Sequence, residues 1–164
     1  MKTLFFIRHA KSSWDDPGLR DHDRPLNARG IRDAPRMANR LLGMDITPDG
    51  ILTSSAKRAQ QTAAYFRDAL NVAPENVIVA QELYHAWPEV IAEHVRQLPD
   101  AWNTVLVFGH NPGYTALTNL LRNDLYIGNV PTCGISGAKA TINSWSAFTF
   151  EDASRFAYLY PKQV

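Results

Sequence analysis

The chain has 164 residues and a formal net charge of +1, and 45% of its residues are hydrophobic and 20% charged. This composition is ordinary for a globular domain and excludes collagen, coiled coils and general disorder, while the near-zero charge argues against nucleic acid as a partner. The length predicts one domain spanning residues 1–164.

Cysteine content and hydropathy predict the compartment. The single cysteine excludes a disulfide framework and a thiolate metal cluster, and it fits a reducing compartment. The apolar run at residues 4–7 is shorter than a signal-peptide core, which needs about 7 or more residues. No stretch approaches the ~20 apolar residues that span a bilayer. We therefore expect a cytoplasmic protein with no membrane partner.

Apolar runs predict the strands of a mainly parallel sheet. Residues 3–7 and 104–108 are apolar on both faces, as central parallel strands require, and residues 51–53 and 77–79 are shorter candidates between them. After Asn123 the pattern changes. Residues 137–142 and 155–160 are strand candidates without a long helix between them, which we expect to finish one edge of the sheet, with antiparallel pairing as an option.

The first predicted helix follows Asn27, a residue type that caps helix N-termini, and ends at Gly43. Pro35 lies inside it and predicts a kink or a break, because proline cannot donate the internal hydrogen bond. The apolar residues expected to share one helix face are Ile31, Ala34, Ala38 and Leu41.

Three further helices are predicted between the later strands. Ser55 can cap the second helix, Pro88 begins a third that reaches Leu98, and Asn111 can cap a fourth that opens with proline and reaches Leu121. On the second helix the shared face holds Ala59, Thr62, Phe66 and Leu70. Strands alternating with helices predict a three-layer α/β/α sandwich with a mainly parallel central sheet.

A histidine follows each of the two apolar runs predicted as central strands. His9 follows the first strand, preceded by Arg8, and His110 follows the fourth. Ligands of open α/β sheets bind outside the carboxyl ends of the strands, so two histidines at equivalent ends predict a shared site.

Arg58 adds an anion-binding signal. If Ser55 caps the second helix, Lys57 and Arg58 lie in its first turn, where the helix dipole disfavours cations unless an anion binds there. The helix after His110 offers similar amides. Several donors converging with two histidines indicate a phosphoryl site, although each residue taken alone also fits a structural role.

Four motifs in this order carry a resemblance to a known family: residues 8–14 (RHAKSSW), 24–30 (RPLNARG), 54–62 (SSAKRAQQT) and 109–113 (GHNPG). Over residues 2 to about 122 the chain resembles the histidine phosphatase superfamily, and within it the short SixA-type phosphohistidine phosphatases. The resemblance implies a phosphoglycerate mutase-like fold.

The resemblance also implies a mechanism. His9 would attack phosphorus and take the phosphoryl group, which water then releases, while Arg8, Arg58 and His110 clamp the phosphoryl oxygens. His9 must be neutral to attack, so a carbonyl or carboxylate should accept a hydrogen bond from its other ring nitrogen. This chemistry requires no metal and no cofactor.

The chain departs from the family pattern at Ala10, where the common motif has glycine, and at two positions that bear on the chemistry. Asp15 stands where the phosphoglycerate mutase branch places an asparagine phosphate ligand, which weakens a mutase-type transferase as an alternative. His85 stands where most branches place a glutamate general acid, so His85 is a candidate acid and Glu82 a weaker one. A missing carboxylic acid fits an easy leaving group such as the imidazole of phosphohistidine.

The substrate is predicted only as a class. Arg24 and Lys11 are candidate substrate-binding residues, and the absence of a long lid insertion permits either a phosphorylated protein or a small phosphorylated molecule. The tryptophans Trp14, Trp87 and Trp102 fit packing roles better than a partner surface. Oligomeric state is not predicted.

Other chemistries fit less well. A cysteine-phosphatase loop beginning at Cys133 would need arginine where Lys139 stands. A zinc site from His9, His85 and His110 has no supporting ligand spacing. A non-catalytic module that binds phosphorylated partners remains an alternative, although it would not need His9.

Overall fold

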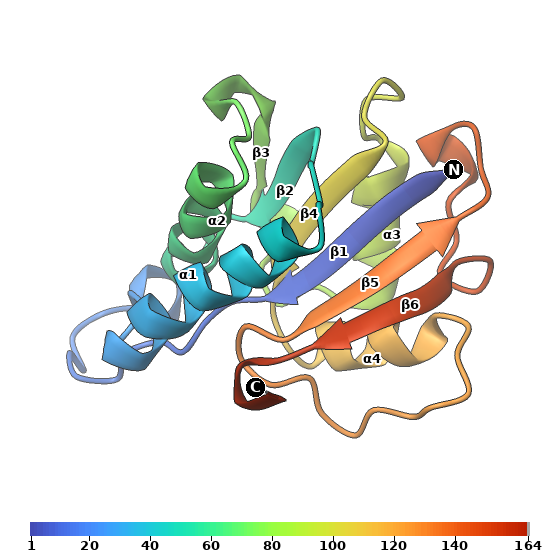
Figure 1. The fold of residues 1–164 in the computed structure, drawn as a ribbon. Helices are drawn as coiled ribbons and strands as arrows, with labels where there is room; N and C mark the ends of the chain where they lie inside the picture. The colour runs from blue at the N-terminus through green and yellow to red at the C-terminus, as the bar shows by residue number, and fades with distance from the viewer. Residues whose placement is uncertain (164) are drawn as a thin grey trace.

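The computed structural model describes residues 1–163 as a six-stranded sheet with helices on both faces (Figure 1). The strands are β1 (Lys2–Arg8), β2 (Gly50–Ser54), β3 (Val77–Ala80), β4 (Thr104–Gly109), β5 (Ile135–Ala140) and β6 (Ser154–Leu159). The α-helices are α1 (Ala28–Gly43), α2 (Lys57–Ala69), α3 (Pro88–Arg96) and α4 (Gly113–Leu120). Short 3-10 helices are η1 (Asp21–Asp23), η2 (Pro74–Asn76), η3 (Gln81–Leu83), η4 (Trp145–Ala147) and η5 (Pro161–Gln163). Within residues 1–163 no helix is both long and apolar enough to cross a bilayer.

The strand order is β3-β2-β4-β1-β5-β6. The first four strands in this order pair in parallel, whereas β5 pairs antiparallel with both β1 and β6. The predicted three-layer α/β/α architecture is therefore confirmed, including the antiparallel edge formed by the last two strands.

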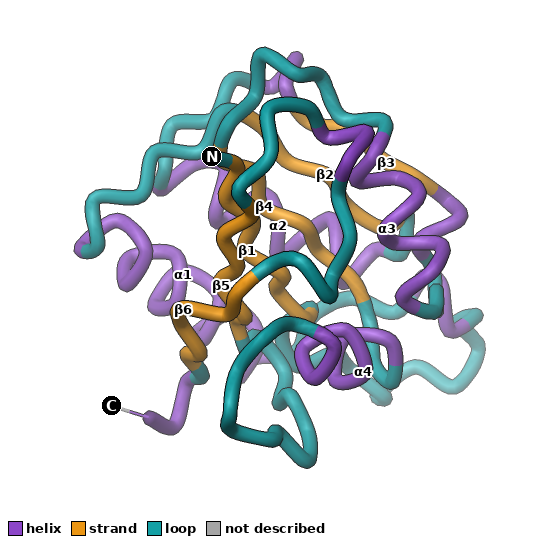
Figure 2. Tube along the Cα trace, turned by 90° about the vertical axis from the view of Figure 1, so that its right-hand side faces the viewer, coloured by secondary structure: helices purple, strands orange, loops and turns teal. Residues whose placement is uncertain are grey.

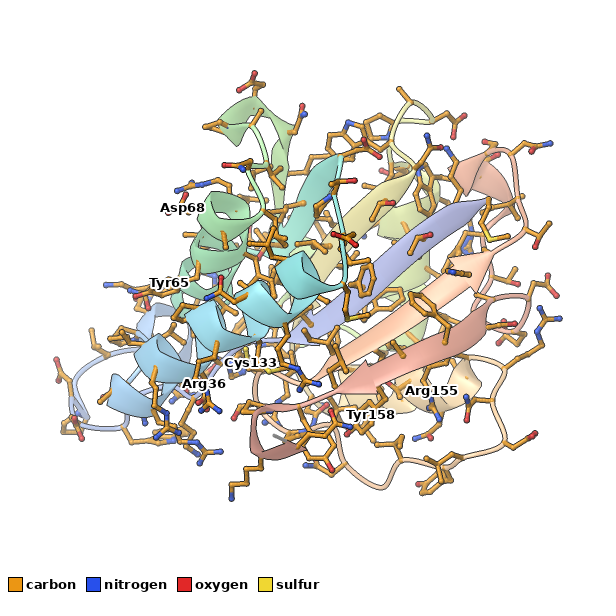
Figure 3. The ribbon with its side chains drawn as sticks, in the orientation of Figure 1. Arg36, Tyr65, Asp68, Cys133, Arg155 and Tyr158 are labelled. Carbon is orange, nitrogen blue, oxygen red and sulfur yellow. The ribbon has the colours of Figure 1, made fainter. Side chains whose placement is uncertain are left out.

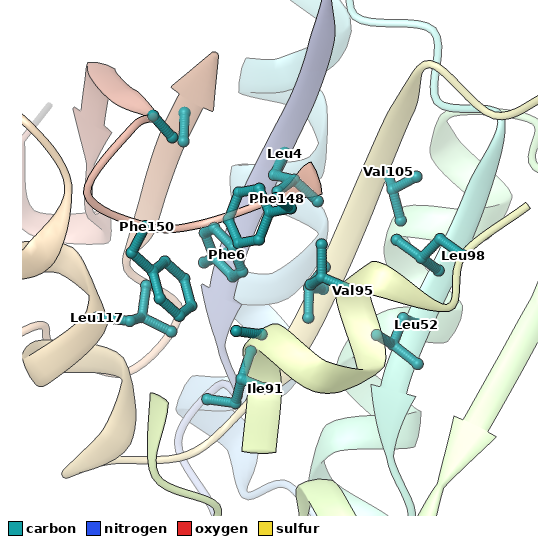
Figure 4. Packing of buried hydrophobic residues seen from close by; sticks show 14 of the residues in the cluster. Leu4, Phe6, Leu52, Ile91, Val95, Leu98, Val105, Leu117, Phe148 and Phe150 are labelled. Carbon is teal, nitrogen blue, oxygen red and sulfur yellow. The ribbon is translucent and has the colours of Figure 1, made fainter. Parts of the chain in front are cut away.

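Each face of the sheet has its own core, because successive side chains of a strand point to opposite faces. On β1, Leu4 and Phe6 belong to the cluster packed under α3 and α4 (Figure 4), while Phe5 and Ile7 belong to the cluster under α1 and α2. Figure 2 shows α1 on one side of the strands and α3 and α4 on the other. Covering both faces explains why residues 4–7 of β1 are all apolar.

Helix α1 begins as predicted but is not broken. The Asn27 side chain accepts a hydrogen bond from the Gly30 N–H at 3.0 Å, and the helix continues through Pro35 to Gly43. The predicted buried face of α1 is wrong at Ile31, which is 50% exposed, and it includes Met37, which was not predicted to be buried. Burial of that face stabilises the helix enough to offset a proline, which costs about 3 kcal/mol in a helix interior.

The predicted caps of α2 and α4 are wrong by one residue. Ala56 is the N-cap of α2 and makes no side-chain cap, because its methyl group has no acceptor, while the Ser54 hydroxyl accepts from the Ala56 N–H at 3.2 Å. Pro112 is the N-cap of α4, although the Asn111 side chain does accept from the Thr115 N–H at 3.0 Å. The third helix ends at Arg96, before the predicted Leu98.

We predict that Gly30→Ala destabilises the protein while Gly43→Ala does not. An added Cβ on Gly30 would lie 2.2 Å from the Lys11 carbonyl oxygen, whereas one on Gly43 meets nothing within 4 Å. Overpacking typically costs about 1–3 kcal/mol, and alanine in place of helical glycine gains up to about 1 kcal/mol. Urea unfolding of both variants measures the difference, and equal midpoints would contradict it.

Candidate active site

The carboxyl ends of β1, β2 and β4 bring the predicted residues together. The parallel pairing places Arg8 opposite Gly109, so His9 and His110 follow neighbouring strands and their ring centroids lie 5.1 Å apart. Arg58, in the first turn of the helix after β2, donates from Nε to His9 Nε2 at 3.3 Å. All three side chains are almost fully buried.

His9 is held with one ring nitrogen ready to attack. Its Nδ1 lies 2.8 Å from the Ala10 carbonyl oxygen, which can only accept, so Nδ1 carries the hydrogen and Nε2 carries the lone pair. This carbonyl is the orienting partner that sequence reasoning could not identify. Burial lowers the pKa of His9 to about 3, the Ala10 bond opposes this shift, and Arg58 reinforces it. His9 is therefore neutral near pH 7.

Arg8 presents a buried donor beside the histidines. Its Nη1 donates to the Val130 carbonyl at 2.9 Å, while its Nε is buried without a hydrogen-bond partner in the described part of the chain. Burial, and second the charge of Arg58, lower the pKa of Arg8. A buried guanidinium donor of this kind suits an anionic ligand.

His110 contributes another such nitrogen. Its Nε2 lies 2.8 Å from the Ser54 hydroxyl, and its Nδ1 is buried with no partner among residues 1–163. Burial and the neighbouring positive groups lower the pKa of His110 to about 2, so the ring is neutral. At the start of α4, the Tyr114 N–H bonds to the His110 carbonyl and the Thr115 N–H bonds to the Asn111 side chain, so these two amides are not free to bind an anion.

Asp21 is the site residue that sequence reasoning missed. Its carboxylate accepts hydrogen bonds from Arg58 Nη2 at 3.0 Å, from the Tyr84 hydroxyl and from His85 Nε2 at 3.1 Å. Burial would raise the pKa of Asp21, but these bonds outweigh it and hold the pKa well below its usual range. The only local signal was its position three residues before Arg24, a spacing that pairs side chains on a helical turn.

Arg24 is held by the protein on several sides. It binds Asp21 Oδ1 through Nη2 at 3.0 Å and Ser12 Oγ through Nη1 at 2.8 Å, and its guanidinium stacks 3.6 Å from the Trp14 ring. Trp14 is 71% exposed, so its predicted packing role is wrong. Lys11 lies on the same loop, half-buried, and its carbonyl accepts from the Asn27 N–H.

The other tryptophans differ. Trp87 is 57% exposed and is therefore not a packing residue, whereas Trp102 packs against the core under α3 and α4, as predicted.

The remaining candidates lie apart from this cluster or lack the required chemistry. Glu82 is exposed and pairs with His94 at 3.7 Å. Cys133 is buried beside α1 and the start of β5 (Figure 3), and burial raises the pKa of its thiol far above the range of a reactive cysteine. No three His, Cys, Asp or Glu residues are grouped to hold a metal ion within residues 1–163.

A neutral, oriented histidine thus lies beside buried arginines at the strand ends of an α/β sheet. Residues 4–114 match the histidine phosphatase superfamily, branch 1, and the chain belongs to this family.

Known relatives agree with this assignment. An uncharacterized protein of Mycobacterium tuberculosis is 40% identical over 117 residues, 71% of this chain and 70% of that protein. The phosphohistidine phosphatase SixA of Escherichia coli is 28% identical over 141 residues, 85% of this chain and 83% of that protein. The structure of a candidate SixA from Nakamurella multipartitia is 28% identical with a TM-score of 0.82, covering 98% of this chain and 96% of that one. These relationships support phosphatase activity on a phosphorylated substrate.

We predict that the two neutral histidines make the protein less stable in acid. In the unfolded chain His9 binds a proton near pH 6.5, whereas in the folded protein it binds one only near pH 3. The free energy of unfolding therefore decreases as the pH falls between these two values. Each such histidine contributes up to about 1.4 kcal/mol per pH unit. We expect His9→Gln to reduce this slope in urea unfolding between about pH 6 and pH 5. Identical slopes in the two proteins would contradict the buried neutral state.

Proposed function

We propose that the protein is a metal-independent phosphatase that works through a phosphohistidine intermediate on His9. The observation that carries the proposal is the state of that ring, with Nδ1 bonded to a carbonyl and Nε2 unprotonated beside Arg58. A neutral imidazole held in one tautomer has the lone pair that in-line attack on phosphorus requires.

In the first step, His9 Nε2 forms a bond to phosphorus while the bond from phosphorus to the leaving group breaks. Arg58 Nε then donates to a phosphoryl oxygen in place of Nε2. Arg8 Nε and His110 Nδ1, the two buried nitrogens without partners within residues 1–163, bind the other oxygens. Donors that are already in place stabilise the charge on the transferring group without reorganisation.

Ser54 sets the tautomer of His110 in this mechanism. Its hydroxyl oxygen accepts from the Ala56 N–H and lies 2.8 Å from His110 Nε2. If the hydroxyl donates its hydrogen to Nε2, then Nε2 is the acceptor of the ring and Nδ1 carries the ring hydrogen. Nδ1 is then a neutral donor for a phosphoryl oxygen.

The second step transfers the phosphoryl group from His9 to water. His85 is the candidate that exchanges protons with the leaving group and then with water, and its ring lies 5.0 Å from that of His110. Its backbone is left-handed, with φ of 54°, a conformation uncommon for a non-glycine residue and found at functional sites. Lys11 and the exposed Trp14 lie on a loop beside the site, where a protein or a small molecule carrying the phosphoryl group would bind.

The substrate proposed is a phosphohistidine of a protein or a small phosphorylated compound in the cytoplasm. The SixA proteins of similar structure carry the name phosphohistidine phosphatase. An imidazole is a better leaving group than an alkoxide, which suits a site whose acid is a histidine exposed to solvent.

His9→Ala should abolish formation of a phosphoenzyme. Protein incubated with a radiolabelled phosphoryl donor and quenched in alkali should carry an acid-labile label in the wild type and in the control His94→Gln, whose ring lies on α3 and bonds to Val90. Label retained in His9→Ala would exclude His9 as the nucleophile. Binding of inorganic phosphate with no label in the wild type would favour the non-catalytic module.

His85→Gln should slow hydrolysis more for a poor leaving group than for a good one. General acid catalysis contributes about 10²- to 10⁴-fold, and mostly where the leaving group needs a proton. We expect a large loss of kcat with an alkyl phosphate and a small one with p-nitrophenyl phosphate or a phosphohistidine peptide. Equal losses on all substrates would remove His85 from the proton transfer.

A further inference from the structure

Asp21 lies where four side chains from three segments of the chain meet. Its Oδ1 binds Arg24, and its Oδ2 accepts from Arg58, Tyr84 and His85. Among the described residues, no other carboxylate forms an ion pair with Arg58 or Arg24. Such a carboxylate is unexpected beside a phosphoryl site, because it would repel a phosphate dianion that came into contact with it.

The bonds between Asp21 and Arg58 resolve this conflict. Arg58 Nη1 donates to the Asp21 backbone carbonyl at 2.6 Å and Nη2 donates to Oδ2 at 3.0 Å, so one edge of the guanidinium is occupied by Asp21. The other edge, formed by Nε and the second Nη2 hydrogen, faces His9, because Nε donates to His9 Nε2. Carboxylate and phosphoryl group would therefore occupy different edges of one planar cation.

Asp21 is itself anchored from the loop after β1. Arg24 binds both Asp21 and the Ser12 hydroxyl, and it donates to the Ser13 carbonyl at 3.0 Å. Stacking on Trp14 covers the remaining face of its guanidinium. The position of Asp21 is thus tied to the same loop that begins with His9.

The same carboxylate orients His85. Because Asp21 is ionised and can only accept, His85 Nε2 must donate to it, which leaves Nδ1 as the ring nitrogen that can exchange a proton. The centroids of the Tyr84 and His85 rings lie 4.2 Å apart, and the Tyr84 hydroxyl also donates to Asp21.

We propose that Asp21 is a positioning residue for phosphoryl transfer, which orients the guanidinium of Arg58 toward His9 and fixes the proton on His85 without touching the substrate. The inference rests on the proposed function and deepens it. Arg58 is 1% exposed, so Asp21 also supplies the charge partner that a buried cation needs.

Asp21→Asn keeps the shape of the side chain but removes its charge and replaces one acceptor by an NH₂ group. We expect kcat/KM to fall about 10- to 100-fold, as when a catalytic group is misplaced by about 1 Å, and Asp21→Glu to restore part of the loss. The matched control is Asp23→Asn, in the same turn, whose partners Arg20 and His22 are not among the phosphoryl ligands. The control should stay within about twofold of the wild type.

A double-mutant cycle with Arg58→Ala separates positioning from a merely structural role. If Asp21 acts through Arg58, adding Asp21→Asn to Arg58→Ala should cause little further loss on p-nitrophenyl phosphate. Full additivity would overturn the proposal, and so would an Asp21→Asn enzyme as active as the wild type or more active.

The positioning role of Asp21 can also be tested without catalysis, by measuring the binding of inorganic phosphate with calorimetry. We expect Asp21→Asn to weaken phosphate binding about as much as Arg58→Ala does. If the wild type forms no phosphoenzyme, the proposed function fails while this comparison still reports on Asp21. Unchanged phosphate affinity in a folded Asp21→Asn protein would overturn the positioning role itself.

Discussion

The arrangement of this site depends on the parallel pairing of β1 with β4. That pairing is in register from Thr3 opposite Thr104 to Arg8 opposite Gly109, and it is covered by apolar packing on both faces. His9 and His110 are adjacent because each is the first residue beyond its strand. The rigid sheet thus sets the distance between the two rings, and the loops supply only the groups around them.

Burial then determines the protonation of the site. A buried imidazole surrounded by guanidinium groups is neutral, because both desolvation and repulsion disfavour a further positive charge. The guanidinium groups stay charged when buried and need partners, which the protein supplies from the Val130 carbonyl for Arg8 and from Asp21 for Arg58. Arg8, Arg24 and Arg58 are the positive charges that act on His9, and Asp21 pairs with the last two of them.

Sequence reasoning succeeded where a feature is local and failed where it depends on the fold. Apolar runs predicted all the strands, and strand ends together with the order of motifs predicted His9, Arg58 and His110. Asp21 was missed because a single aspartate in a polar loop has no periodicity, and its importance comes from Arg58, which is 37 residues away. Ser55 was assigned a capping role, but the helix begins one residue later with Ala56 as its N-cap, since a one-residue shift at the end of a strand leaves no trace in composition.

The contact between Arg58 and His9 connects these observations. A guanidinium can donate to Nε2 only if that atom bears a lone pair, so the 3.3 Å contact requires the same neutral tautomer that the Ala10 carbonyl imposes from the other side of the ring. The other edge of the Arg58 guanidinium bonds to Asp21. The Ala10 carbonyl, His9, Arg58 and Asp21 therefore form one chain of hydrogen bonds.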